Sequence, residues 1–450
     1  MGSNAKSMAN TSIVEGLEKK RKIEEEWRSI YSSKQPLTQL DFPPDFTFGV
    51  ATSAYQVEGA CNEDGRGPCI WDAFSQVPGK ICDGSTADVA VDQYHRYKED
   101  IDLIAKLGFK AYRFSISWSR IFPDGLGTKV NLEGIRHYNN LINALIDKGM
   151  PYVTLYHWDL PLNLLESMGE TCFSSFGDRV KNWITINEPL QTAVNGYGTG
   201  FCAPGRRGHS SSEPYLVAHH QLLAHAEAVS IYNKKYKDSQ GGQIGLVVDC
   251  EWSEALSDKV EDKNAATRRL DFQLGWYLDP IYQGDYPETM REKLGDCLPK
   301  FSERDKELLK NSVDFIGLNH YTTRYAPGAS SAGRQPVMGH QGPGLKPTSC
   351  NYSLCQRGPG VGARAWLPSS LVAVGGPKGP CHTELEGGEM IGEKAASSWL
   401  YMVPWGLRKL LNYIAMRYNN PPVYITENVS IISLVLLHPW IKEIARTPAI

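Results

Sequence analysis

The segment NWITINEP, residues 182–189, decides the fold of this chain. Its β-branched and aromatic side chains follow one another without a charge until the run ends, a composition typical of a strand that is buried on both faces. The run then delivers an amide, Asn187, and a carboxylate, Glu188. Barrel enzymes place their functional side chains at the carboxyl ends of such strands. The segment therefore predicts a buried parallel strand that ends in polar chemistry.

Six other runs share this composition. They are FTFGVATSA (46–54), AYRFSISW (111–118), PYVTLYHW (151–158), QIGLVVD (243–249), DFIGLNHYT (314–322) and PPVYITEN (421–428). Between them lie amphipathic stretches such as residues 92–108 and 134–149, whose apolar positions recur at helical spacing and which both end in glycine. This alternation of strands and helices predicts a parallel sheet that is covered on both sides.

The predicted strands fall one short of the eight that close a barrel of alternating strands and helices. We therefore expect the α/β class and a (β/α)8 TIM barrel from which the eighth strand–helix unit is missing, with a gap between the first and seventh strands. An open, doubly wound sheet is the alternative. The sequence disfavours it because no glycine-rich phosphate loop follows the first strand.

The composition of the 450 residues excludes several classes of protein. A hydrophobic content of 41% and a charged content of 22% are globular values. The formal net charge of -3 argues against nucleic acid or an anionic membrane as the partner. The N-terminal stretch contains no apolar core of signal-peptide length, and the ten cysteines show no zinc-site spacing. We expect a cytoplasmic protein with reduced thiols and without a bound metal.

Two carboxylates, Glu188 and Glu427, each follow a predicted strand and each neighbour an asparagine. Carboxylates are expensive to bury, so two of them at buried strand ends need a reason. One explanation is ion pairing with a base such as Arg113. The other is glycoside hydrolysis, which needs a proton donor for the leaving oxygen and an anion that faces the sugar carbon. The residues alone leave both explanations open.

Six motifs, in this order along the chain, resemble family one glycoside hydrolases, the retaining β-glucosidases. They are SAYQVEG (53–59), RFSISWSRIFP (113–123), YHWDLP (156–161), TINEP (185–189), GLNHYT (317–322) and YITEN (424–428). The resemblance covers about residues 41–325 and 390–428 and is strongest to plant β-glucosidases of the cytosolic kind.

This resemblance implies an O-glycosyl hydrolase that acts on terminal β-D-glucosides through a covalent glycosyl-enzyme. Its partner would be a small-molecule β-glucoside, and it would need neither a metal nor an organic cofactor. By position in the motifs, Glu188 matches the acid/base and Glu427 the nucleophile, which Arg113 and Tyr321 would support. The residues that the resemblance implies for substrate binding are Gln56, His157, Asn187, Asn319 and Tyr321.

Three segments depart from the family pattern. Residues 165–183 are short for a complete helix and its loops, which predicts a truncated helix or a strained crossover. About a third of residues 326–381 are glycine or proline, which predicts an irregular insert. After Glu427 the family continues with a glycine and an eighth strand, whereas this chain continues with Val429 and an unrelated apolar run.

These departures lead to the predicted organisation of the chain. We expect a helical or disordered extension over residues 1–40, a catalytic barrel over 41–428 that contains the irregular insert, and an atypical tail over 429–450. The pattern suggests a truncated or alternatively spliced chain with impaired activity. The alternative is a non-catalytic glycoside-binding protein or a non-functional isoform.

Overall fold

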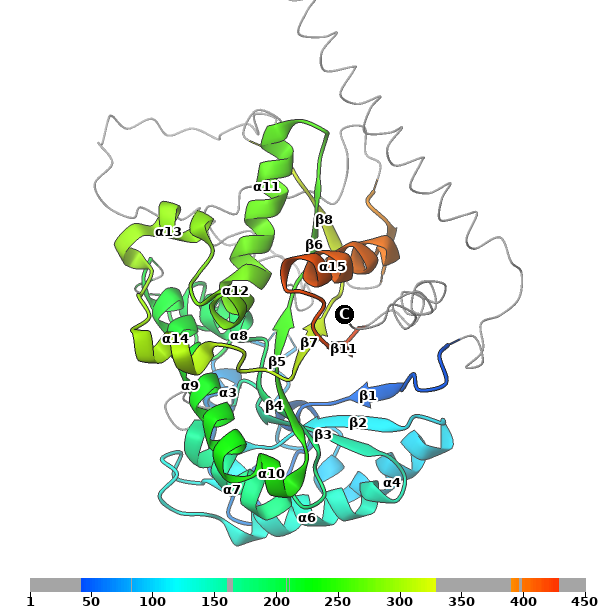
Figure 1. Ribbon diagram of the computed structural model, residues 1–450. Helices are drawn as coiled ribbons and strands as arrows, with labels where there is room; N and C mark the ends of the chain where they lie inside the picture. The colour runs from blue at the N-terminus through cyan, green and yellow to red at the C-terminus, as the bar shows by residue number, and fades with distance from the viewer. Residues whose placement is uncertain are drawn as a thin grey trace, which may run out of the picture.

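The protein is described here from a computed structural model (Figure 1). The residues that the structure describes are 42–81, 83–159, 165–207, 209, 211–328, 390–395 and 399–428. The predicted N-terminal extension, nearly all of the predicted insert and the predicted C-terminal tail lie outside these residues.

Seven strands form one parallel sheet with the order β1-β2-β3-β4-β5-β7-β11. Their bounds are β1 Gly49–Ala51, β2 Ala111–Ser115, β3 Met150–Tyr156, β4 Asn182–Asn187, β5 Gln243–Asp249, β7 Phe315–Asn319 and β11 Val423–Glu427. Each strand overlaps one of the predicted runs, and all neighbouring strands pair in parallel. The predicted parallel sheet is therefore confirmed.

The sheet curls into a barrel that is nearly closed (Figure 1). The ring of Tyr424 on β11 lies 5.7 Å from that of Tyr152 on β3 and bonds through its hydroxyl to Gln243 on β5 at 3.0 Å. Side chains of one edge strand therefore reach across the interior to the middle of the sheet. Among the described residues, β1 and β11 each have a single neighbour, so the predicted gap lies between them.

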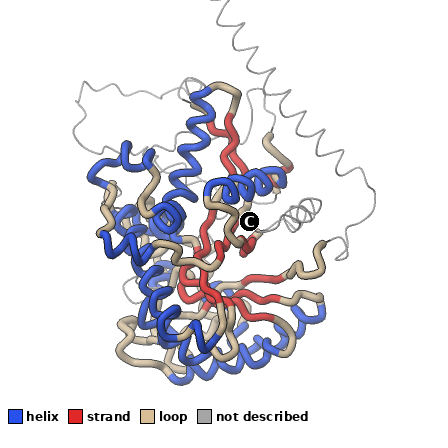
Figure 2. Tube along the Cα trace, viewed as in Figure 1, coloured by secondary structure: helices blue, strands red, loops and turns tan. Residues whose placement is uncertain are grey.

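Helices cover the outside of the sheet (Figure 2). Those that connect consecutive strands are α4 Gln93–Lys106, α6 Leu132–Ile146, α7 Leu165–Phe176, α9 Glu213–Lys235, α11 Val260–Leu270, α12 Trp276–Gln283, α14 Glu303–Leu309 and α15 Pro404–Arg417. The segment 165–183, for which the sequence predicts a truncated helix or a strained crossover, contains the 12-residue helix α7. Its Phe173 packs on Trp183 of β4 with ring centroids 5.0 Å apart.

Shorter helical segments form the loops at the ends of the strands. They are α2 Ala54–Val57, α3 Ile70–Ser75, α5 Trp118–Ile121, α8 Pro189–Gln191, α10 Lys237–Gln240, α13 Glu288–Leu294, the π-helical turns Thr192–Gly196 and Asp271–Gly275, and the 3-10 turn Gly295–Cys297. Two small sheets add to them. They pair β6 Trp252–Ala255 with β8 Thr323–Ala326, in parallel, and β9 Glu393–Lys394 with β10 Tyr401–Met402, antiparallel.

The strands between the two edges of the sheet are mostly buried because their side chains face either the interior or the helices. Every residue of β2, β4 and β7 is buried. The interior is tight enough to require glycine: a Cβ on Gly317 would lie 2.4 Å from Cγ2 of Val247, and one on Gly245 would lie 2.5 Å from the carbonyl oxygen of Phe315. Such packing fixes the register of the strands, and it thereby fixes where their carboxyl ends place functional side chains.

Candidate active site

Glu427, at the end of β11, is held by side chains from two other strand ends. Its Oε1 accepts a bond from Nη1 of Arg113 on β2 at 2.7 Å, and its Oε2 accepts one from the hydroxyl of Tyr321, which follows β7. The Glu427 side chain is 24% exposed. Burial favours its neutral form, but the positive charge of Arg113 and the bond from Tyr321 outweigh burial and hold the pKa of Glu427 below its usual value.

Glu188, by contrast, is held by the backbone turn that ends β4. Its φ of 45° and ψ of 62° are left-handed, and Pro189 begins α8 directly after it. Its amide donates to the carbonyl of Val247 on β5 at 2.9 Å, and its Oε1 accepts from Nδ2 of Asn319 at 2.6 Å. A left-handed backbone at a non-glycine residue costs about 1–3 kcal/mol and is concentrated at functional sites.

The environment of Glu188 displaces its pKa in the direction opposite to that of Glu427. Burial raises the pKa of Glu188 well above its usual value, and the negative charges of Asp249 and Glu427 raise it further. The bond from Asn319 and the charge of Arg113 only partly oppose these effects. Glu188 therefore favours its protonated form, and Glu427 favours its ionised form.

The Asn187 side chain bonds to Arg113, which holds Glu427, and to Asn319, which holds Glu188. Its Oδ1 accepts bonds from Arg113 and, at 3.3 Å, from Nδ2 of Asn319. Its Nδ2 lies 3.3 Å from Nε2 of His157, and its carbonyl accepts from Nε1 of Trp158 at 3.0 Å. Burial lowers the pKa of His157 to about 3, so this imidazole is neutral and its Nε2 can accept the Asn187 amide proton.

Gln56 is the one predicted site residue that stands apart from this network. In the described part of the chain its Oε1 accepts a bond from the Ser53 hydroxyl at 2.7 Å, and the side chain is exposed. It lies in α2, just beyond the carboxyl end of β1, and the amide of Thr52 before it bonds to the carbonyl of Arg113 at 2.9 Å. Gln56 therefore lies at the same end of the barrel as the two carboxylates.

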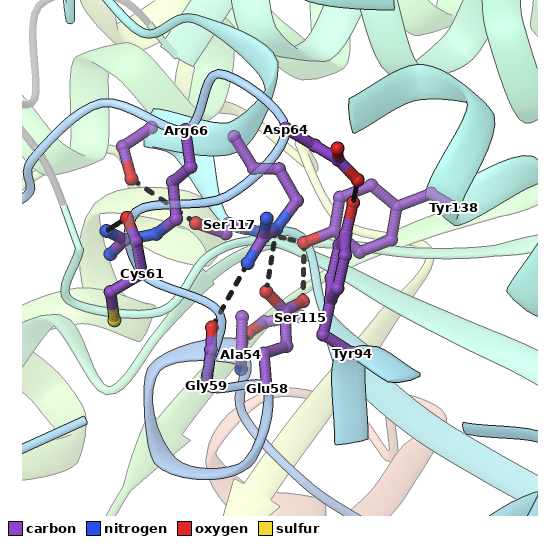
Figure 3. A network of polar contacts seen from close by, with 12 residues as sticks. Ala54, Glu58, Gly59, Cys61, Asp64, Arg66, Tyr94, Ser115, Ser117 and Tyr138 are labelled. Carbon is purple, nitrogen blue, oxygen red and sulfur yellow. Dashed lines mark hydrogen bonds and ion pairs between the residues drawn. The ribbon is translucent and has the colours of Figure 1, made fainter. Parts of the chain in front are cut away.

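A buried ion pair fixes the loop that carries Gln56 (Figure 3). Oε2 of Glu58 lies 3.1 Å from Nε of Arg120, and Oε1 of Glu58 accepts from the hydroxyl of Tyr138 at 2.6 Å. The amide of Ala54 donates to the Ser115 hydroxyl at 2.7 Å. Removing one partner of a buried ion pair is strongly destabilising, so these contacts stabilise the position of α2 at the end of the barrel.

Two side chains near the two carboxyl groups are not among the site residues that the sequence predicts. Asp249 ends β5 and accepts a bond from Nε2 of Gln191 at 2.6 Å. The ring of Trp399 lies 5.9 Å from that of Tyr321, at an interplanar angle of 73°. Asp249 could have been found from the sequence, because it is a polar residue at the carboxyl end of a predicted buried strand, as are the other predicted site residues at strand ends. Trp399 follows none of the predicted strands, and the sequence contains no signal that places it here.

The described residues contain no group of three or more His, Cys, Asp or Glu side chains that could hold a metal ion. Two histidines of α9 have partners in the core instead. His219 bonds to the Tyr286 hydroxyl at 3.0 Å, and His225 bonds to the Thr185 hydroxyl at 2.7 Å. In the described part of the chain, no helix combines the length and the apolar character that are needed to cross a membrane.

Comparison with known proteins identifies the family. The pattern of glycosyl hydrolase family 1 matches residues 38–433. The chain belongs to this family. By homology it is an O-glycosyl hydrolase of the β-glucosidase type, as the sequence predicts.

Individual relatives agree with this assignment. Beta-glucosidase 42 of Arabidopsis thaliana is 57% identical over 411 residues, which cover 87% of this chain and 77% of that protein. Beta-glucosidase 4 of Oryza sativa subsp. japonica is 55% identical over 408 residues, with the same coverage of 87% and 77%. The crystal structure of a rice beta-glucosidase superposes with a TM-score of 0.76 at 46% identity, covering 87% of this chain and 80% of that one. The predicted TIM-barrel class is thereby confirmed.

Proposed function

We propose that this protein hydrolyses terminal β-D-glucosides with retention of configuration, with Glu427 as nucleophile and Glu188 as acid and base. The opposite displacement of their two pKa values carries the proposal. When neighbouring carboxyl groups are driven apart in this way, the one that keeps its proton is suited to be the acid and the one that stays charged is suited to attack.

In the first step, Glu427 attacks the anomeric carbon while Glu188 protonates the leaving oxygen. The bond from carbon to the aglycone oxygen breaks, a bond from carbon to a Glu427 oxygen forms, and the aglycone departs as an alcohol. Arg113 and Tyr321 keep Glu427 charged and oriented before the attack. Tyr321 remains a proton donor because burial and the charge of Glu427 raise its pKa well above its usual value.

In the second step, Glu188 changes from acid to base. Ester formation removes the negative charge of Glu427, which is one cause of the high pKa of Glu188. The pKa of Glu188 therefore falls, and its carboxylate takes a proton from the water that attacks the sugar carbon. Glu427 leaves as a carboxylate, and the product is β-D-glucose.

The glucosyl unit would be oriented by polar side chains around the pair. Asn187 and Asn319 offer amide groups from the ends of β4 and β7, and His157 offers a neutral imidazole. Gln56 contributes from the loop that the Glu58 ion pair fixes. A side chain that bonds a sugar hydroxyl more strongly in the transition state than in the ground state raises kcat as well as kcat/KM.

The product of azide rescue tests the two roles directly. With Glu427→Ala, azide should replace the missing nucleophile and give the α-glucosyl azide from an aryl β-glucoside with a good leaving group. With Glu188→Ala, azide should attack the glycosyl-enzyme and give the β-glucosyl azide. Glu303→Ala, whose side chain is 90% exposed, serves as the control and should behave as the wild type. Exchanged products would reverse the assignment of the roles.

A non-catalytic glycoside-binding protein or a non-functional isoform is the second candidate. The complete pair of carboxyl groups with their supporting side chains favours the enzyme. Release of phenol from an aryl β-glucoside by wild-type protein distinguishes the two. Impaired activity of the chain stays a prediction. Comparing its kcat/KM on an aryl β-glucoside with that of another family member tests it.

A further inference from the structure

Asp249 is a buried carboxylate that the mechanism above does not use. Its residue is 8% exposed, and it ends β5, the strand next to that of Glu188. In the sheet it pairs with Asn319, whose amide donates to Glu188. The amide of Glu188 in turn bonds to Val247, two residues before Asp249. A charge buried at this position therefore lies beside the acid, across adjacent strand ends.

A chain of amides ties Asp249 to the turn that carries Glu188. Gln191 donates through its backbone to the carbonyl of Glu188 at 3.0 Å and through Nε2 to Oδ2 of Asp249 at 2.6 Å. Asn195, one helical turn further on, donates to Oε1 of Gln191 at 2.5 Å. Because Glu188 has a left-handed backbone, this turn needs support, and the Asp249 side chain supplies a point of attachment.

We propose that Asp249 is a positioning residue that holds the turn of Glu188 in place and, by its negative charge, keeps Glu188 in the acid form. This inference rests on the proposed function, in which Glu188 is the proton donor. Asp249 itself touches no reacting atom in that mechanism.

Of the other charges around Glu188, that of Glu427 acts in the same direction, but only while Glu427 is ionised. The charges that shift the pKa of Glu188 are those of Asp249 on β5, Glu427 on β11 and Arg113 on β2. Glu188 in turn raises the pKa of Tyr321, after β7, and of Cys202, in the loop before α9. Arg113 acts in the opposite direction. The charge of Glu427 disappears when the glycosyl-enzyme forms, whereas Asp249 takes no part in that step. Asp249 therefore also sets how strong a base Glu188 is in the second step.

Asp249→Asn tests this role because it removes the charge and keeps the shape. Without the neighbouring anion, ionised Glu188 is more stable, so its proton is lost at lower pH. The alkaline limb of kcat/KM on an aryl glucoside with a poor leaving group should move to lower pH by about half to one unit. Asp249→Glu restores the charge and should return the limb toward the wild-type position. Asp258→Asn, whose side chain is 76% exposed, should leave the limb unchanged.

Gln191→Leu separates the two roles of Asp249, which are holding the turn of Glu188 in place and acting on Glu188 by its charge. It breaks the attachment to the turn while Asp249 keeps its charge. This variant should lower kcat without moving the alkaline limb. A limb shift in Gln191→Leu as large as that in Asp249→Asn would overturn the role of the charge.

A titration that needs no turnover makes the test independent of the proposed function. The carboxyl carbon of Glu188 can be followed by NMR in protein labelled with 13C at the Glu side-chain carboxyl, with the signal assigned through Glu188→Gln. The midpoint should lie at lower pH in Asp249→Asn than in wild type, and Asp249→Ser should give the same shift if the asparagine variant does not fold. An unchanged midpoint in a folded variant overturns the inference. If wild type releases no phenol, the proposed function fails instead, and the NMR comparison still decides the role of Asp249.

Discussion

Strands β4 and β11 each end in a carboxylate, but the barrel supports them differently. All residues of β4 are buried and the strand has neighbours on both sides. No residue of β11 is buried, and among the described residues its only neighbour is β7. The backbones of Glu188 and Glu427 both bond to a neighbouring strand end, but one side chain holds the Glu188 carboxyl group whereas two hold that of Glu427. Glu427, at the edge of the sheet, therefore depends more than Glu188 on side chains from other strands.

The largest effect that this comparison predicts concerns Arg113. Arg113→Met removes the charge that opposes burial of Glu427 and the bonds to Glu427 and Asn187. Two charge-assisted bonds are worth about 3–6 kcal/mol, so kcat/KM should fall by about a hundredfold to tens of thousands of times. The pKa of Glu427 should rise, which moves the acid limb of the pH profile to higher pH. An acid limb at the wild-type position would contradict the dependence of Glu427 on Arg113.

Arg136→Met provides the matched control for Arg113. Its guanidinium pairs with Glu133 on the surface, and its side chain is 66% exposed. Exposed ion pairs contribute little, so kcat/KM and the pH profile should stay at wild-type values. A loss comparable to that in Arg113→Met would mean that the loss reflects general damage rather than the site.

The next effect concerns the acid on the buried strand. Glu188→Ala should reduce kcat/KM by about a hundredfold to ten-thousandfold on aryl glucosides with poor leaving groups, because these need a proton. Glucosides with good leaving groups should lose much less in the first step. The slope of log kcat/KM against the pKa of the phenol measures this, and a slope equal to that of the wild type would reject Glu188 as the acid.

A smaller effect is expected from removing the hydrogen bond that the Tyr321 hydroxyl donates to Glu427. Tyr321→Phe removes one bond to a charged acceptor, which is worth about 1.5–3 kcal/mol, and should lower kcat/KM by about ten- to a hundredfold. Because the bond lowers the pKa of Glu427, the acid limb should move to slightly higher pH. Tyr97→Phe, on the outer helix α4, is the control. Equal activity of both variants would show that Tyr321 does not support the nucleophile.

The smallest effect compares the stability of the two strands. Thr185 on β4 is fully buried and bonds to His225, so Thr185→Val leaves a buried imidazole without this partner and should cost about 1–3 kcal/mol of unfolding free energy. Thr426 on β11 is partly exposed and bonds to Asn319 at 2.7 Å, so Thr426→Val should cost about 0.5–1.5 kcal/mol. Urea denaturation measures both, and a larger loss for Thr426→Val would reverse the comparison.

The buried strands could be predicted because burial on both faces leaves a continuous apolar run in the sequence. Strand β6 could not, because Trp252–Ala255 is short and contains a glutamate, and its partner β8 lies about 70 residues away. The packing of helix α7 could not be predicted either, because the length of a connection does not reveal that Phe173 packs on Trp183.

The site was predictable where a motif gave the residue and incomplete where only the fold brings residues together. Glu188, Glu427, Arg113 and Tyr321 follow from motifs, and the structure joins them with their neighbours in one set of contacts. Trp399 lies beside Tyr321 only because the fold brings the two rings together, and no local sequence pattern around Trp399 indicates this contact.

Identification of the residue that becomes glycosylated tests the central claim most directly. A 2-deoxy-2-fluoro-β-glucoside with a good leaving group forms the glycosyl-enzyme but hydrolyses it slowly, because fluorine destabilises the oxocarbenium-like transition state. Mass spectrometry of peptides from the trapped protein should then locate a single fluoroglucosyl group on Glu427. The same treatment of Glu427→Gln should leave the protein unlabelled. A group on Glu188, or on any residue other than Glu427, would contradict this account.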